Sequence, residues 1–217
     1  MIRAVLFDLD GTLADTAPDL AYAVNCMRGA RNLPPLPLSA TRPVTSLGAR
    51  GLLNVAFGLG PEDPGYDTMR EEFLQLYERH ICRETRLFPG TDCLLDSLES
   101  RGLRWGVVTN KMERLARLLL DMLALTTRAA CIIGGDTAAR PKPHPEPLLA
   151  ACQAVGVDAA DCIYVGDDRR DVEAGQAAGM KVVAAKWGYC NGGRPESWCA
   201  NWIMEQPTDV LRLVQLN

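Results

Sequence analysis

The stretch MIRAVLFDLDGTLAD, residues 1–15, largely decides the fold that we expect for this chain. Residues 4–7 form a short apolar run with β-branched and aromatic side chains, which is typical of a strand buried on both faces of a sheet. The run leads directly into Asp8 and Asp10, and residues i and i+2 of an extended chain point to the same side. Two neighbouring carboxylates repel and are costly to desolvate unless a cation or a shared proton offsets their charge. The stretch therefore predicts a metal site at the end of a strand that is buried on both faces.

The composition excludes several classes of partner. Of the 217 residues, 47% are apolar and 23% are charged, which is ordinary for a globular protein with a sizeable interior. The formal net charge is −4 and there is no run of Lys or Arg, so we expect neither a nucleic-acid nor a membrane partner. An anionic ligand would have to be held locally, by particular side chains and a cation.

The cysteines and the apolar runs indicate the compartment. None of the eight cysteines lies in a Cys-x-x-Cys pair and most fall in apolar stretches, as buried free thiols of a reducing compartment do. No apolar run approaches the length of a membrane span, and the acids that begin at Asp8 interrupt any signal-peptide pattern. We therefore expect a cytoplasmic protein that acts as a monomer or a homodimer.

Beyond residue 85 the hydrophobic pattern alternates between strand and helix. The expected strands cover residues 103–108, 131–133, 162–165 and 182–185, and the expected helices cover residues 92–101, 113–125, 147–155, 171–178 and 209–216. This alternation predicts an α/β fold with a doubly wound parallel sheet and helices on both faces. Residues 16–84 show helical patterns and no strand pattern, so we interpret them as a helical cap domain inserted into a core formed by residues 1–15 and 85–217.

Ligands of such sheets bind beyond the carboxyl ends of the strands, and further polar side chains follow the expected strands. Thr109 and Asn110 come directly after strand 103–108 and can donate hydrogen bonds to phosphate oxygens. Lys142 lies between two prolines, where its ammonium can offset carboxylate charge and pair with a phosphate. We expect these groups to lie near the two aspartates of the first strand.

Three acids follow the strand expected at residues 162–165. They are Asp167, Asp168 and Asp171, next to a glycine and at the start of a helix. Acids at this position can complement the helix dipole, but three of them exceed what a helix cap requires. Together with Asp8 they would suit a hard cation such as Mg²⁺, which prefers oxygen ligands and takes substrate phosphate.

Taken in order, the four groups of residues resemble the four motifs of the haloacid dehalogenase-like hydrolases. The resemblance covers nearly the whole chain and is greatest for the phosphoglycolate phosphatases, whose helical cap lies between the first and second motifs. From Trp105 onward the chain is also similar to the N-acetylmuramic acid 6-phosphate phosphatases, and the marks of this likeness are Gly166-Asp167-Asp168, Trp187-Gly188-Tyr189, Trp198-Cys199-Ala200 and Glu205-Gln206-Pro207.

The resemblance implies a phosphatase that acts through an aspartyl-phosphate. Asp8 would be the nucleophile, and Asp10 would protonate the leaving oxygen and then take a proton from water. The implied Mg²⁺ would be bound by Asp8, the backbone carbonyl of Asp10 and Asp167. Asp168 or Asp171 would either bind the ion directly or hold the groups that bind it.

The resemblance also implies the remaining roles in the site. Thr109 and Asn110 would hold the phosphoryl oxygens, and Lys142 would balance charge. Arg50 lies where the cap of similar phosphatases meets the substrate, so its guanidinium could bind a carboxylate; a solvated surface arginine is the alternative. The partner is then a small phosphate ester, with 2-phosphoglycolate favoured over N-acetylmuramic acid 6-phosphate.

Three other functions are compatible with the fold, and the motifs fit them to different degrees. The intact pair of Asp8 and Asp10 argues against a haloacid dehalogenase, which needs no acid at the second position and no metal. A non-catalytic binding module would be expected to have lost Asp8, Asp10 or Lys142, and all are present. A sugar phosphomutase similar to β-phosphoglucomutase would keep all four motifs, so that alternative stays open.

Overall fold

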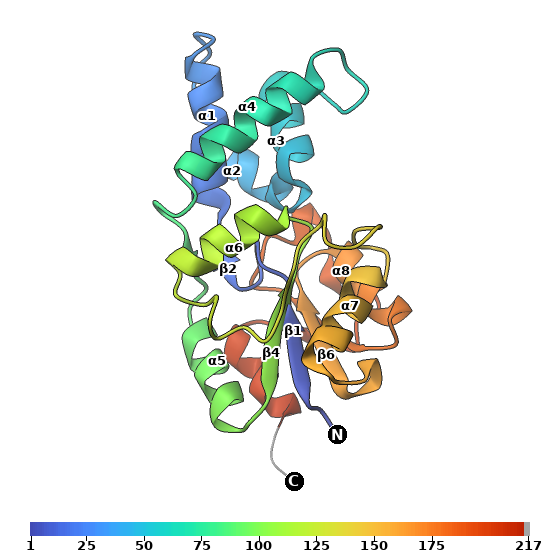
Figure 1. The fold of residues 1–217 in the computed structure, drawn as a ribbon. Helices are drawn as coiled ribbons and strands as arrows, with labels where there is room; N and C mark the ends of the chain where they lie inside the picture. The colour runs from blue at the N-terminus through green and yellow to red at the C-terminus, as the bar shows by residue number, and fades with distance from the viewer. Residues whose placement is uncertain (215–217) are drawn as a thin grey trace.

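The computed structural model describes residues 1–214, and a parallel six-stranded sheet lies at its centre (Figure 1). The strand order is β5-β4-β1-β6-β7-β8. The strands span Ala4–Phe7 (β1), Arg104–Val108 (β4), Ile132–Ile133 (β5), Cys162–Gly166 (β6), Lys181–Ala185 (β7) and Trp202–Met204 (β8). Val5 of β1 pairs with Trp105 of β4 on one side and with Ile163 of β6 on the other. The first strand therefore lies in the middle of the sheet, with a neighbouring strand on each side.

Alternation along β1 sends its side chains into two separate cores. Val5 and Phe7 belong to the core under α5 (Thr91–Ser100) and α6 (Glu113–Met122). The intervening Leu6 belongs to the core under α7 (Glu146–Val155) and α8 (Arg169–Ala177), which cover the opposite face. Because both faces are covered, β1 is a continuous buried apolar run, and the expected doubly wound α/β fold is confirmed.

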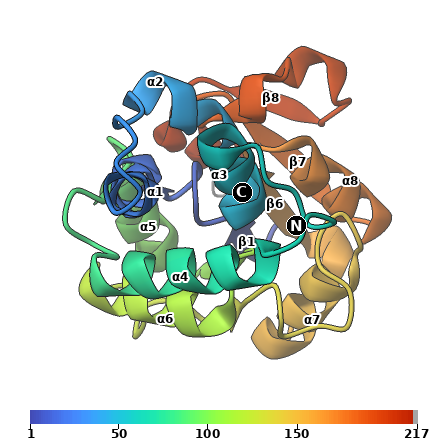
Figure 2. The same cartoon turned by 90° about the horizontal axis from the view of Figure 1, so that it is seen from above.

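Residues 17–79 form the helices that lie above the carboxyl ends of the strands (Figures 1 and 2). They are α1 (Ala17–Gly29), α2 (Leu38–Thr41), the 3₁₀ helix η1 (Arg42–Leu47), α3 (Gly48–Phe57) and α4 (Tyr66–Arg79). The chain enters and leaves this group through an antiparallel ribbon formed by β2 (Ala14–Asp15) and β3 (Arg86–Leu87). The ribbon supports the proposed division into a core and a cap at residues 16–84.

The last part of the chain differs from the expectation. Strand β8 was not predicted, because it has only three residues and a single buried side chain, Met204. The helix expected at residues 209–216 is a 3₁₀ helix, η5, at Pro207–Leu213, and residues 215–216 lie outside the described part. Short terminal segments commonly take this tighter geometry, and η5 packs Val210 against α5.

The remaining boundaries differ from the expected ones by at most a few residues. The largest difference is at α6, which ends at Met122 before a residue with positive φ, Ala124. No helix within residues 1–214 is long and apolar enough to cross a membrane.

Candidate active site

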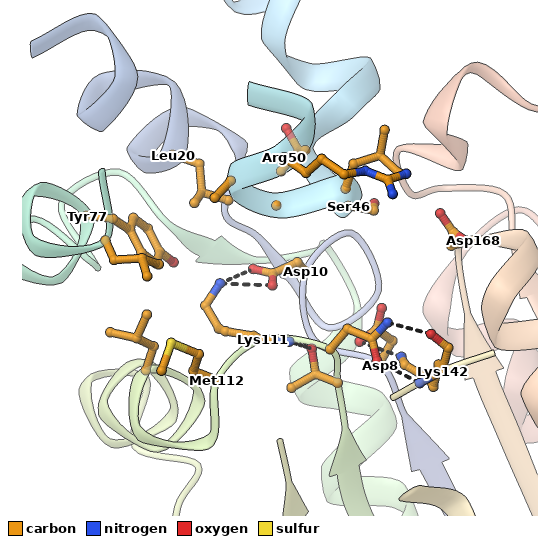
Figure 3. A pocket seen from close by; sticks show the side chains of 18 of the residues that line it. Asp8, Asp10, Leu20, Ser46, Arg50, Tyr77, Lys111, Met112, Lys142 and Asp168 are labelled. Atoms are coloured by element: carbon orange, nitrogen blue, oxygen red, sulfur yellow. Dashed lines mark hydrogen bonds and ion pairs between the residues drawn. The ribbon is translucent and has the colours of Figure 1, made fainter. Parts of the chain in front are cut away.

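The predicted site residues meet at the carboxyl end of the sheet, beneath the cap (Figure 3). A cavity of about 260 Å³ lies between the strand ends and helices α3 and α4. Eight of the nine predicted residues line it: Asp8, Asp10, Arg50, Thr109, Asn110, Lys142, Asp168 and Asp171. The ninth, Asp167, is fully buried beside Asp8. Distant parts of the sequence are thus brought together because parallel strands end at one edge.

An acidic cluster lies at the bottom of this cavity. Carboxylate oxygens of Asp8, Asp167 and Asp171 lie within 4.8 Å of one another, and all three residues are buried. Burial, followed by the charges of Asp8 and Asp171, raises the pKa of Asp167 well above its usual value. Such a group of hard oxygen donors fits a divalent cation, because a cation offsets both the repulsion and the lost hydration.

The backbone around Asp167 fixes its orientation. Thr12 Oγ1 donates to Asp167 Oδ1 over 3.0 Å, and the Tyr189 amide donates to Oδ2 over 2.9 Å. Gly11 packs directly against this carboxylate with a φ of 85°, so a side chain there would both clash and be strained. The glycine of the first motif is therefore required because the turn after β1 passes directly against the Asp167 side chain, which follows β6.

Lys142 is the cation that accompanies the cluster. Its ammonium lies 2.6 Å from Asp171 Oδ1 and 3.1 Å from Asp8 Oδ1, and its side chain is 2% exposed. Tyr164 Oη and the Val108 carbonyl, at 2.7 and 3.0 Å, complete its surroundings. Burial alone would lower the pKa of Lys142, but the charges of Asp171 and Asp8 hold it above its usual value. Lys142 therefore keeps its positive charge beside Asp8, the nucleophile that the resemblance implies.

The two remaining acids of the fourth motif are engaged by protein donors. The Lys142 ammonium donates to Asp171 Oδ1 over 2.6 Å, and the Asp168 amide donates to Asp171 Oδ2 over 3.0 Å. Asp168 caps helix α8 and pairs with Arg170 at 2.8 Å, and it also accepts from Asn191. The geometry favours Asp8 and Asp167 as direct metal ligands, with Asp171 holding Lys142 and Asp168 holding the start of α8.

Asn110 and Thr109 follow β4 as expected but have different surroundings. The Asn110 amide group donates to the Lys142 carbonyl over 2.8 Å and accepts from the Lys142 amide over 2.9 Å. Its side chain thus fixes the Lys142 loop, which differs from the phosphate contact expected for that side chain. Thr109 is buried and lines the cavity next to Asp8, where its hydroxyl can reach a phosphoryl oxygen.

Arg50 lies at the start of α3, on the cap side of the cavity. Its side chain is exposed, and it makes no hydrogen bond or ion pair with any residue between 1 and 214. Its expected contact with substrate therefore stays a prediction.

Three cationic residues that line the cavity were not singled out from the sequence, namely Lys111, Arg170 and, on the cap helix α4, Arg70. Lys111 contacts both oxygens of Asp10, and Arg170 donates to the Ser46 carbonyl of the cap over 2.8 Å. Lys111 directly follows Thr109 and Asn110, so its place after a strand end could have identified it. Arg170 follows two acids at a helix start, where a solvated side chain is the ordinary expectation.

Comparisons with known proteins agree with the fold and with the family that the motifs indicate. Residues 5–185 match the family model described as haloacid dehalogenase-like hydrolase. A phosphoglycolate phosphatase of Xanthomonas campestris pv. campestris (strain 8004) is 50% identical over 209 residues, which cover 96% of this chain and 94% of that protein. An N-acetylmuramic acid 6-phosphate phosphatase of Pseudomonas aeruginosa is 41% identical over 211 residues, covering 97% and 93%. The crystal structure of a predicted phosphoglycolate phosphatase from Haemophilus somnus has a TM-score of 0.88 at 27% identity, covering 99% and 98%.

The chain therefore belongs to the haloacid dehalogenase-like hydrolase family, as its four motifs indicated. Within that family it is a phosphatase, an enzyme that hydrolyses phosphoric monoesters.

Proposed function

We propose that this phosphatase uses Mg²⁺ and hydrolyses 2-phosphoglycolate to glycolate and phosphate. The observation that carries the proposal is the buried cluster of Asp8, Asp167 and Lys142 at the bottom of a small cavity. The relative that is 50% identical is named a phosphoglycolate phosphatase, which supports the choice of substrate. The cavity of about 260 Å³ is slightly smaller than most ligand pockets, which usually measure about 300–1,000 Å³, so it favours a small substrate.

The proposed reaction begins with attack of a carboxylate oxygen of Asp8 on phosphorus. The new O–P bond forms as the ester O–P bond breaks, and Asp10 gives its proton to the departing glycolate oxygen. Water then attacks the aspartyl-phosphate, Asp10 takes one proton from it, and the Asp8 carboxylate is restored as phosphate leaves. Asp8 and Asp10 lie on the same side of the chain after β1, which supports this division of roles.

The surrounding groups supply charge and hydrogen bonds for this reaction. Mg²⁺ bound by Asp8, Asp167 and the backbone carbonyl of Asp10 would neutralise charge on the phosphoryl oxygens. Lys142 can hold another of these oxygens from its position 3.1 Å from Asp8, and Thr109 can donate from the end of β4. Phosphoryl transfer depends mainly on such positioning and electrostatic stabilisation.

N-acetylmuramic acid 6-phosphate is the second candidate substrate. The 41% identity to a phosphatase of that name over nearly the whole chain favours it. It is a much larger molecule than 2-phosphoglycolate, and the cavity beneath the cap would have to widen to admit its sugar ring.

A phosphate-release assay with and without metal tests the proposal. We expect turnover on 2-phosphoglycolate with Mg²⁺, a larger kcat/KM than on N-acetylmuramic acid 6-phosphate or sugar phosphates, and loss of activity when EDTA is added because the acidic cluster is then unbalanced. Adding Mg²⁺ back should restore the rate. Full activity in EDTA would contradict the metal, and isomerisation of a sugar phosphate without phosphate release would point to a mutase.

A further inference from the structure

Lys111 has a position in the site that the proposed reaction leaves unexplained. Its ammonium lies 2.8 Å from Asp10 Oδ1 and 2.9 Å from Oδ2, and its side chain is only 6% exposed. Thr16 Oγ1 also donates to Asp10 Oδ1, over 2.6 Å. Both oxygens of Asp10 are thus occupied by donors. An anion that draws the Lys111 ammonium away would leave Asp10 Oδ2 open toward a leaving oxygen.

The cap side of Lys111 is formed by Tyr77 of α4. The ammonium lies 4.7 Å from the centre of the Tyr77 ring, a distance at which a cation and an aromatic face attract each other. The Tyr77 hydroxyl is buried and has no hydrogen-bond partner among residues 1–214. Burial, together with the nearby charge of Asp10, raises the pKa of Tyr77 well above its usual value, so the phenol is a donor at neutral pH.

These groups surround one part of the cavity. Tyr77, Lys111 and Asp10 all line it, and Figure 3 shows the Lys111 ammonium on Asp10 with the Tyr77 ring on the adjoining wall. Two donors from different parts of the fold, Lys111 from the core and Tyr77 from the cap, therefore lie next to the carboxylate expected to protonate the leaving oxygen. A buried donor without a partner is unfavourable, so the arrangement favours a bound acceptor.

We propose that Lys111 determines specificity by binding a carboxylate carried on the carbon next to the leaving oxygen, with Tyr77 as a second donor. This inference rests on the proposed phosphatase reaction. In 2-phosphoglycolate the carboxylate is attached to the carbon that bears the leaving oxygen, so placing that oxygen beside Asp10 brings the carboxylate to Lys111. The ammonium then exchanges Asp10 for the substrate carboxylate, and the released Asp10 carboxyl group can face the leaving oxygen and carry the proton that the proposed reaction transfers to it.

The same geometry discriminates between the two candidate substrates. In N-acetylmuramic acid 6-phosphate the carboxylate belongs to a lactyl group on another carbon of the ring, several bonds from the phosphate ester. Because of this separation, we expect that carboxylate not to reach Lys111 while the ester oxygen lies beside Asp10. If the substrate has no carboxylate near the ester, the buried Lys111 ammonium would have no anion to replace Asp10, and leaving it unpaired costs free energy. The site therefore disfavours phosphate esters that lack a neighbouring carboxylate.

Kinetics on a matched pair of substrates test this role. The pair is 2-phosphoglycolate and 2-hydroxyethyl phosphate, which carries a hydroxymethyl group in place of the carboxylate. We expect K111M to lower kcat/KM roughly 100-fold on 2-phosphoglycolate and less than about tenfold on 2-hydroxyethyl phosphate, since only the first substrate loses an ion pair. K111R should recover part of the loss because the charge is kept. K181M, at the exposed amino end of β7, is the control and should match the wild type on both.

Equal losses on both substrates would overturn the proposal, because Lys111 would then serve Asp10 alone. Binding separates this result from a failure of the proposed function. In a D8N background with Mg²⁺, calorimetry should show 2-phosphoglycolate binding weakened roughly 100-fold by K111M and less by Y77F. If the wild type does not hydrolyse 2-phosphoglycolate but D8N binds it in a Lys111-dependent way, the proposed substrate is wrong and the specificity of Lys111 stands.

Discussion

Replacing Asp8 with asparagine is expected to lower kcat by at least about 10⁴-fold on every phosphomonoester that the wild type hydrolyses. The amide cannot attack phosphorus, and no other carboxylate can replace it, because Asp167 and Asp171 are held by other donors. The fold should survive, since an asparagine oxygen can still accept from the Leu9 amide, which lies 2.8 Å from Asp8 Oδ1. Circular dichroism, the thermal midpoint and phosphate release would be measured together.

A suitable control for this variant is D121N. Asp121 lies exposed on α6, away from the cavity, so the same chemical change there should leave turnover unaltered. If D8N kept more than a few per cent of wild-type activity, Asp8 would not be the nucleophile. If D8N failed to fold, Asp8 would have a structural role that its surroundings do not suggest.

Replacing Lys142 with methionine is expected to remove activity and to destabilise the fold by about 3–5 kcal/mol. The change leaves the carboxylates of Asp8 and Asp171 buried without their cation, and Asp171 is only 1% exposed. For a chain of this size the thermal midpoint shifts by about 2–4 °C per kcal/mol, so a decrease of about 6–20 °C is expected. The thermal midpoint should be measured in EDTA, because a bound metal cation would offset part of the repulsion between the carboxylates of Asp8 and Asp171 that Lys142 no longer balances.

The double variant K142M/D171N distinguishes the ion pair from a general effect of the substitution. Removing the charge of Asp171 should restore a large part of the lost stability, because only one of the two carboxylates that Lys142 had paired with, Asp8, then keeps its charge. K181M should keep the wild-type midpoint. A midpoint for K142M equal to that of K181M would show that Lys142 does not bear the buried charge described here.

The arrangement of the core could be predicted largely from local patterns. The apolar run of β1 and the glycines that end the helices mark elements whose order dictates a parallel sheet. The site followed from the same pattern, because parallel strands end at one edge and three of the four polar motifs come directly after a strand, while Lys142 lies on the loop between β5 and α7. Strand β8 could not be predicted, since its pairing with β7 depends on contacts between distant residues and its own apolar signal is short.

The roles within the site were harder to predict than its location. Whether Asp171 binds a metal or Lys142 depends on side-chain directions at the start of α8, which spacing alone does not determine. The sequence could place Asn110 near the phosphate, but it could not predict that its side chain hydrogen-bonds the backbone of Lys142, which is 32 residues away. The position of Lys111 after a strand end could have marked it as a site residue, but its contacts with Asp10 and with Tyr77 of the cap are visible only in the structure.

Trapping the covalent intermediate tests the central claim most directly. The wild type would be mixed with 2-phosphoglycolate and Mg²⁺, quenched in acid within the first turnover, and treated with borohydride, which reduces an aspartyl-phosphate to homoserine. Peptide mass spectrometry should then find homoserine at position 8, only when both substrate and Mg²⁺ are present, and none in D8N. Homoserine at another aspartate, or full turnover with no modified residue at any quench time, would contradict the assignment of Asp8 as the nucleophile.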